Sequence, residues 1–307
     1  MPGAEIQQYS GQFKEVSSFN GANGFILSSF DKKQKFIFEK QVAEGGIHYN
    51  SFKEKVQSKD EYLNSGTAFL NKLKTRKLSK AIFSRVKEVG SLEKPENIFN
   101  ELALSYPDAF VYLISSPFFG TWVGASPEVL LHVEKGQGRT VALAGTKATG
   151  DKSSWGVKEK VEQKIVSDFI DQKLVQLKLE KVKSSNVKEF IAGPVKHLVK
   201  HFSFEQGEVA IADIIELLHP TPAVCGLPIE SAMKLIEEEE QHNRSLYAGV
   251  IGVIAEDESK LFVNLRCAQL FEQKALLYIG GGYTVDSIVE DEWLETENKA
   301  KTLLKVL

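Results

Sequence analysis

The stretch FVYLISSPFFGTWVGASPEVLLHVEKGQGRTVALA, from Phe110 to Ala144, is the part of the sequence that decides the fold. It holds four short apolar runs, rich in aromatic and β-branched residues, with turn-forming segments between them, and such runs are typical of β-strands. We predict strands at Phe110–Ser115, Thr121–Gly124, Val129–Val133 and Thr140–Ala144, with Glu134–Arg139 as a hairpin loop. Strands in series without intervening helices indicate an antiparallel sheet rather than a doubly wound parallel one.

The same reasoning extends in both directions along the chain. Further strands are predicted at Phe25–Phe30, Lys35–Lys40, Lys80–Val86, Ala248–Ala255, Leu261–Leu270 and Ala275–Ile279. Helices are predicted at Asp60–Thr75, Pro95–Leu104, Lys158–Lys181, Pro194–His201 and Ile229–Glu240, and from about Ser287 to the C-terminus. Because the helices are grouped between runs of strands, the pattern predicts an α+β fold, and with no linker or repeat in sight we expect one domain over residues 1–307.

Composition narrows the class of protein. Apolar residues make up 42% and charged residues 26% of the 307 residues, as in an ordinary globular domain, and the net charge of −3 argues against a nucleic-acid partner. Two cysteines are too few for a disulfide framework. The uncharged run Ala109–Pro127 is 19 residues long, but proline and glycine interrupt it, so we predict two buried strands rather than a membrane span. With no signal peptide in the first residues, we expect a cytoplasmic protein.

Glu162 is an anomaly in the long predicted helix. On a helical wheel it lies in the middle of an apolar face, formed by Ile165, Val166, Phe169, Ile170 and Leu177. A buried carboxylate is costly unless it is paired or binds a metal. The helix alone favours a salt bridge to a buried Arg or Lys, with a metal or catalytic role as the alternative.

The final predicted helix carries a second group of charged residues. Ser287 and Glu290 have the spacing of a capping box, while Glu292, Glu295 and Lys299 share one face. Taken alone, that face is typical of a solvated surface with a Glu295–Lys299 pair. The glycine triple 280–282, predicted to end the preceding strand, weakens this interpretation because bare backbone could approach a ligand there.

Two basic residues lie in predicted strands. Lys80 begins a strand, where a lysine is usually solvated, whereas Arg266 lies inside an apolar run and needs an anionic partner, from the protein or from a ligand. The spacing of His197 and His201 matches no zinc motif, and no nucleophile motif is present. The residues themselves therefore indicate acidic and basic groups, grouped around a divalent ion or paired with one another, without naming a reaction.

Seven segments, in one consistent order from Lys80 to the C-terminus, resemble the chorismate-utilising enzymes, which comprise the isochorismate, salicylate, anthranilate and aminodeoxychorismate synthases. The segments are KAIFSR (80–85), GASPEVLL (124–131), ALAGT (142–146), HPTPAVCGLP (219–228), RSLYAG (244–249), NLRCAQL (264–270) and GGGYTVDSIVEDEWLETENK (280–299). The resemblance implies an anthranilate synthase component I-like fold, with helices outside two large antiparallel sheets. Residues 80–307 would form the motif-bearing core, and residues 1–79 a shortened N-terminal part.

Within that family the sequence is most similar to the isochorismate synthases. Aminodeoxychorismate synthases have a nucleophilic lysine where this chain has Ala144, and anthranilate synthases have glutamine where it has Lys80. Salicylate synthases also carry the lysine and are the main alternative within the family. A chain that keeps the fold but only binds a ligand or partner is a further alternative, which the presence of Lys80, Glu128, Glu162 and Glu295 disfavours.

The resemblance implies a Mg²⁺-dependent conversion of chorismate to isochorismate, by addition of water at ring carbon C2 and loss of the C4 hydroxyl. Lys80 would be the general base and Glu128 the general acid. Glu162 and Glu295 would hold Mg²⁺, with Glu292 behind them. The substrate would be positioned by Gly145, Thr146, His197, Tyr247, Arg266, Gly280 and Lys299. No obligate glutaminase subunit is expected, and the product could serve menaquinone or siderophore biosynthesis.

Overall fold

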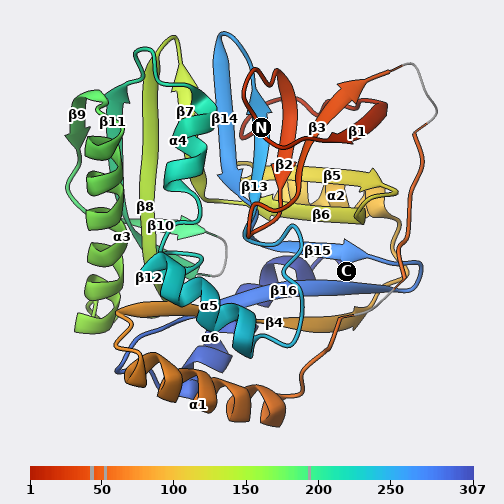
Figure 1. Ribbon diagram of the computed structural model, residues 1–307. Helices are drawn as coiled ribbons and strands as arrows, with labels where there is room; N and C mark the ends of the chain where they lie inside the picture. Colours follow the sequence, from red (N-terminus) through yellow and green to blue (C-terminus); the bar gives the residue numbers. More distant parts are fainter. Residues whose placement is uncertain (42–44, 52–53, 193–194) are drawn as a thin grey trace.

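The computed structural model describes residues 1–41, 45–51, 54–192 and 195–307 (Figure 1). Its helices are α1 (Lys59–Thr75), α2 (Pro95–Ser105), α3 (Val157–Gln176), α4 (Ile211–Leu218), α5 (Ile229–Glu239) and α6 (Val289–Leu304). The strands of the first half are β1 (Gly11–Glu15), β2 (Gly24–Ser28), β3 (Lys35–Lys40), β4 (Lys80–Gly90), β5 (Phe110–Ser116), β6 (Gly120–Ser126), β7 (Val129–Glu134) and β8 (Gln137–Ala148). Those of the second half are β9 (Glu180–Ser184), β10 (Lys188–Ala192), β11 (Val195–Glu205), β12 (Gly226–Leu227), β13 (Val250–Ile254), β14 (Glu258–Val263), β15 (Cys267–Leu270) and β16 (Lys274–Tyr283).

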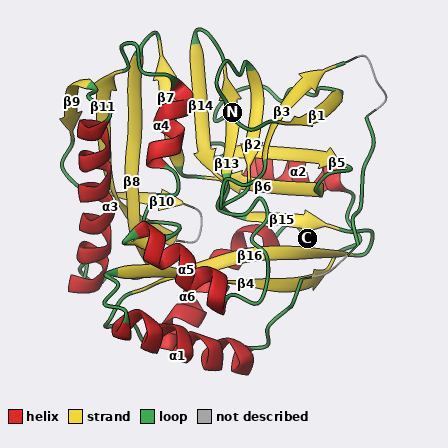
Figure 2. Ribbon diagram, in the orientation of Figure 1, coloured by secondary structure: helices red, strands yellow, loops and turns green. Residues whose placement is uncertain are grey.

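The strands form two antiparallel sheets, which confirms the predicted α+β fold. The larger, ten-stranded sheet has the order β1-β3-β2-β13-β14-β7-β8-β11-β10, with β9 also paired to β11, and the smaller, six-stranded sheet has the order β12-β4-β16-β15-β6-β5. In Figure 1 the long strands of the larger sheet run upright and those of the smaller sheet run across the picture. Helix α3 packs on β8 and β11, whereas α5 packs on β4, α6 on β16, and α2 on β5 and β6 (Figure 2).

Two chain crossings between the sheets place the site. The chain leaves the smaller sheet at the end of β6 and enters the larger one at β7, with Glu128 in the connection; it returns between β14 and β15, with Arg266 in the connection. The crossings are hydrogen-bonded together: the Ala125 N–H donates to the Arg266 carbonyl (3.1 Å), and the Val263 N–H to the Glu128 carbonyl (3.0 Å). Glu128 and Arg266 are therefore held next to each other where the two sheets meet.

The predicted helix at Pro194–His201 is wrong. Pro194 lies outside the described residues, and Val195–Glu205 forms strand β11, paired along its length with β8. A register shift between His197 and Leu198 puts consecutive residues on the buried side. The bulge interrupts the simple alternation of a strand, so the apolar residues acquire a spacing that mimics a helix.

The predicted strand Leu261–Leu270 is two strands in different sheets. β14 ends at Val263 and β15 begins at Cys267, with Arg266 between them in the left-handed conformation (φ 50°). An uninterrupted apolar run carries no signal of this crossing. The predicted long helix is also too long at its C-terminus, because α3 ends at Gln176, and helix α4 and strands β9 and β10 were not predicted.

The end of the chain differs from prediction in two details. Strand β16 continues through the glycine triple to Tyr283 instead of ending before it. The expected capping box is absent from α6, whose N-cap is Ile288; the Ser287 hydroxyl instead accepts from the Thr284 N–H (3.0 Å) and donates to Glu292 (2.7 Å). In the part of the chain that the structure describes, no helix combines the length and the apolar character needed to span a membrane.

Candidate active site

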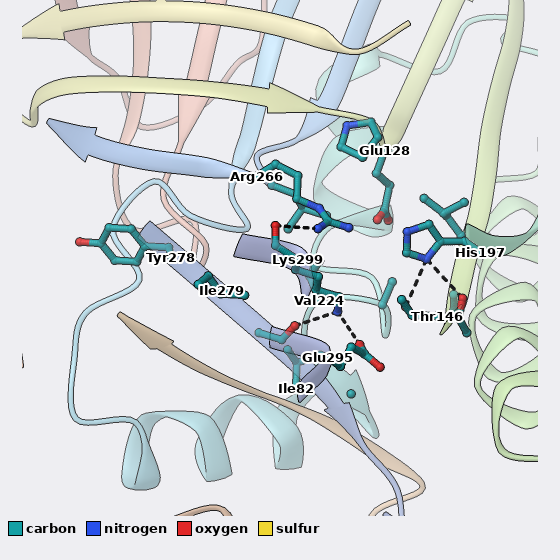
Figure 3. Close-up of a pocket in the computed structure, with 18 of the residues that line it drawn as sticks. Ile82, Glu128, Thr146, His197, Val224, Arg266, Tyr278, Ile279, Glu295 and Lys299 are labelled. Carbon is teal, nitrogen blue, oxygen red and sulfur yellow. Dashed lines mark hydrogen bonds and ion pairs between the residues drawn. The ribbon is translucent and has the colours of Figure 1, made fainter. Parts of the chain in front are cut away.

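A pocket of about 820 Å³, including its open mouth, lies where the two sheets meet (Figure 3). Eleven of the twelve residues singled out from the sequence line it, although they come from widely separated segments. They are Lys80, Glu128, Gly145, Thr146, Glu162, His197, Tyr247, Arg266, Gly280, Glu295 and Lys299. The twelfth, Glu292, is fully buried just outside this lining. The structure thus brings the set together, while the role of each member stays a prediction.

One side of the pocket is cationic. The Arg266 guanidinium donates to the Lys299 carbonyl (3.1 Å), and the Lys299 ammonium donates to the Gly280 carbonyl (2.8 Å) and pairs with Glu295 (2.6 Å). Among the described residues, Arg266 has no carboxylate within 4.0 Å. Its remaining N–H donors are therefore available to an anionic ligand, as the apolar surroundings of Arg266 in the sequence suggested.

Glu128 and Lys80 are a carboxyl and an amine that are both buried in the pocket. Glu128 is 4% exposed, and burial raises its pKa from 4.5 to about 7, against the opposing effect of Lys80, Lys299 and Arg266. Lys80 is 2% exposed, so the expectation of a solvated strand-edge lysine is wrong. Its Nζ lies 3.3 Å from a carboxylate oxygen of Glu162. Near neutral pH, Glu128 can therefore carry and release a proton inside the pocket.

His197 presents a bare ring nitrogen. Its Nδ1 lies 3.2 Å from both the Gly145 carbonyl and the Thr146 hydroxyl, and its Nε2 is buried without a hydrogen-bond partner. Burial lowers the pKa of His197 to about 3, helped by Arg266 and Lys299, so the ring is neutral. The Nδ1–H then donates to the Gly145 carbonyl, and Nε2 is left as an acceptor for a ligand hydroxyl. Figure 3 shows His197 facing Glu128 and Arg266.

Glu162, Glu292 and Glu295 come from two helices, α3 and α6. Each has a lysine partner: Glu162 has Lys80 (3.3 Å) and Lys158 (3.7 Å), Glu292 has Lys158 (2.6 Å), and Glu295 has Lys299. The buried salt bridge that the helix alone favoured for Glu162 is present. Burial, with the neighbouring Glu295, raises the pKa of Glu292 to about 7. The interpretation of this face of α6 as solvated is wrong, because Glu292 is 0% exposed.

The glycine triple makes room for these side chains. A Cβ on Gly281 would lie 3.2 Å from Oε2 of Glu292, and one on Gly282 would lie 3.0 Å from Cε of Lys80 and 3.3 Å from a carboxylate oxygen of Glu162. At Gly280 a Cβ would lie 2.8 Å from the Tyr247 hydroxyl. The triple therefore allows the polar groups to lie directly against bare strand backbone.

The residues present fit a hard divalent cation. Oε2 of Glu292 is buried without a hydrogen-bond partner, so it is an acceptor oxygen that a cation could satisfy. All three candidates are carboxylates, the donors that Mg²⁺ prefers. The carboxylate oxygens of these three residues are not all within 4.8 Å of one another. Among the described residues, a group of three possible ligands that is this close together lies elsewhere, at the partly exposed His132, Glu134 and Glu258.

Sequence reasoning missed two contributions to this region. Lys158, four residues before Glu162 and so on the same side of α3, pairs with both Glu162 and Glu292; its spacing was the available signal. Ala223 and Val224 of the proline-rich segment line the pocket. The Arg244 guanidinium holds that segment by donating to the Val224 carbonyl (2.7 Å) and to the Ile82 carbonyl (3.0 Å).

Comparisons with known proteins point to one family. A family model described as chorismate binding enzyme matches residues 25–307. The anthranilate synthase component 1 of Aquifex aeolicus is 30% identical over 69% of this chain and 46% of its own length. The chloroplastic isochorismate synthase of Catharanthus roseus is 32% identical over 65% of this chain and 37% of its own length. The matches thus span less than half of these relatives.

A solved structure shows the same fold. The menaquinone-specific isochorismate synthase MenF of Escherichia coli superposes with a TM-score of 0.81, covering 98% of this chain and 89% of that one, at 20% identity. A likeness at this identity carries the fold and no more, so the reaction has to be argued from the pocket.

Proposed function

The chain belongs to the family of chorismate-binding enzymes, and we propose that it is an isochorismate synthase, which converts chorismate to isochorismate. In this reaction water adds at ring carbon C2, the ring double bonds shift, and the C4 hydroxyl departs as water. The reaction needs one group that takes a proton from the attacking water and one that gives a proton to the departing hydroxyl. The proposal therefore depends on finding a base and an acid in one pocket.

Lys80 and Glu128 in the same pocket are the observation that carries the proposal. Lys80 would accept the proton from water at Nζ, and protonated Glu128, with a pKa of about 7, would donate to the C4 oxygen. After one turnover Lys80 holds an extra proton and Glu128 lacks one. The proton must return to Glu128 before the next turnover, so the net reaction is an isomerisation without net proton transfer.

The remaining pocket residues would bind and orient the substrate. Chorismate carries two carboxylates, and Arg266, free of a carboxylate partner within 4.0 Å in the described chain, would bind one of them together with Lys299. Neutral His197 would accept a hydrogen bond from a ligand hydroxyl at Nε2. Tyr247, 5% exposed, would bound the ring near Gly280.

Glu162 and Glu295 would hold Mg²⁺, with Glu292 behind them. When bound, the ion would supply positive charge that binds and polarises a substrate carboxylate. The acidic side chains come from the helices α3 and α6. They lie against the backbone of β16, where Gly281 faces Glu292 and Gly282 faces Glu162. The unpartnered oxygen of Glu292 supports this assignment.

Water is favoured over ammonia as the nucleophile. Ala144 lines the pocket where the resembling aminodeoxychorismate synthases have a nucleophilic lysine, so a covalent adduct at this position is impossible. Lys80 stands where anthranilate synthases have glutamine. A water-using enzyme needs no source of ammonia, so we propose that it works without a glutaminase subunit.

Product analysis tests the proposal. The protein is incubated with chorismate, with and without Mg²⁺ and with and without an ammonium salt, and the products are separated by chromatography. We expect isochorismate as the main product, formed only with Mg²⁺ and unaffected by ammonium. Anthranilate or aminodeoxychorismate as the main product would overturn the proposal in favour of an amine-forming synthase, and salicylate with pyruvate would identify a salicylate synthase.

A further inference from the structure

Lys158 lies among the three carboxylates assigned to the metal. Its ammonium is 2.6 Å from Oε1 of Glu292 and 3.7 Å from Oε1 of Glu162, and Glu295 is close enough to act on it electrostatically. These contacts join α3 to α6, the two helices that supply the carboxylates. Lys158 therefore places a positive charge between Glu162 and Glu292, in a cluster whose other cations are Lys80 beside Glu162 and Lys299 beside Glu295.

Apart from its contacts with the carboxylates, Lys158 lies at an unfavourable position for a positive charge, the start of a helix. Lys158 is the second residue of α3, and the positive end of a helix dipole disfavours a cation in the first turn. The side chain is 29% exposed, and the residue before it, Val157, is 80% exposed, so solvent is within reach of the chain end. The carboxylates therefore hold the ammonium inward, and open space is available to it if they are neutralised by another cation.

Lys158 leaves the cluster incompletely satisfied. It contacts Oε1 of Glu292, which also accepts from the Ser287 hydroxyl (2.7 Å), while Oε2 of the same buried carboxylate has no partner. An ammonium has three donors on one side of a flexible stem, whereas Mg²⁺ accepts oxygen ligands from all directions. The unpartnered oxygen is thus open to a cation other than Lys158.

We propose that Lys158 is a built-in counter-cation, which neutralises the carboxylates in the metal-free protein and is displaced toward solvent when a divalent cation binds. The proposal rests on the metal assignment made above. It means that metal binding is a competition: the apparent dissociation constant equals the intrinsic one divided by the fraction of molecules in which Lys158 has moved out. If that fraction is one tenth or less, removing the ammonium tightens binding by about tenfold or more.

Titration calorimetry with Mg²⁺ or Mn²⁺ alone, without chorismate, measures this competition. Lys158→Gln should bind either ion at least about tenfold more tightly than the wild type. The matched control is Lys164→Gln, which removes one positive charge from the same helix where Lys164 forms an exposed pair with Asp168 (2.7 Å). The control should bind the ion like the wild type, and Lys158→Met provides a second variant if the glutamine variant folds poorly.

Displacement itself is followed in the wild-type protein. Reductive methylation, with mass spectrometry of each lysine, reports how exposed each amine is. Methylation of Lys158 should speed up when Mg²⁺ or Mn²⁺ is added, while that of Lys164 should not change. A rate at Lys158 that is unchanged or lower with bound metal would overturn the proposal, as would equal or weaker metal binding by Lys158→Gln.

These readouts are separate from the reaction. If no isochorismate forms but metal displaces Lys158, the proposed function is refuted and the proposal that Lys158 is a counter-cation is supported. If isochorismate forms with Mg²⁺ but the methylation of Lys158 does not speed up, only the counter-cation proposal is refuted. If no ion binds to the wild type or to the Lys158 variants, the metal assignment and the counter-cation both fall.

Discussion

Replacing Glu128 by Gln should stabilise the protein while it removes the proposed acid. Burial raises the pKa of Glu128 from 4.5 to about 7, so its ionised form is disfavoured in the folded state by about 3 kcal/mol. Between pH 4.5 and 7 the folded protein holds a proton that the unfolded chain releases, so this group lowers the stability as the pH rises through that window. The cost is absent below pH 4.5 and complete above pH 7.

Denaturant unfolding of wild type and Glu128→Gln at a series of pH values checks this. The free energy of unfolding of the variant minus that of the wild type should increase by up to about 3 kcal/mol between about pH 4 and about pH 8. The increase arises because the wild type loses stability as Glu128 is forced to ionise. Glu101→Gln is the control, because Glu101 is exposed on α2 and its carboxylate meets water in both states. A constant difference between Glu128→Gln and wild type across this range would refute the buried, protonatable acid on which the mechanism depends.

Three further experiments, each with its own substitutions, test the remaining residues of the proposed mechanism. Lys80→Ala should lower turnover by about 10²–10⁴ in a protein that still folds, measured by steady-state kinetics with circular dichroism as the folding check; near-normal turnover would remove Lys80 from the mechanism. Glu162→Gln and Glu295→Gln should each abolish the Mg²⁺-dependent rise in melting temperature measured with chorismate, and the double variant should be scarcely worse than either, whereas additive effects would argue against one shared site. Gly282→Ala, whose Cβ would lie 3.0 Å from Lys80, should reduce turnover, while Gly90→Ala, with nothing within 4 Å, should not; equal activity of the two would show that the strand tolerates a side chain there.

Much of the fold could be predicted because its strands carry strong local signals. The runs from Phe110 to Ala144 hold their β-branched and aromatic residues between clear turns, and each forms a strand near its predicted bounds. The failures occur where local pattern and tertiary pairing disagree. The bulge in β11 mimics a helix, and the crossing at Arg266 is set by which sheet each half joins, which an apolar run does not encode.

The candidate site shows a similar division. Glu162 could be singled out because a carboxylate on an apolar face needs a partner, and the structure supplies Lys80 and Lys158. Lys80 itself carried no such signal, since a lysine at the start of a strand is ordinarily solvated; its burial follows from the packing of α3 and β16 around it. The burial of Glu292 could not be predicted for the same reason, because the depth of a helix face depends on what packs against it.

The most direct test of the central claim is the fate of oxygen when chorismate and Mg²⁺ are incubated with the protein in oxygen-18-labelled water. If Lys80 activates water for attack at C2 and Glu128 protonates the departing C4 hydroxyl, mass spectrometry should find one labelled oxygen in the isochorismate formed, located at C2. Isochorismate without label would mean that the original hydroxyl migrates and no water is activated. An aminated product, or no conversion, would contradict the assignment of this pocket to water addition.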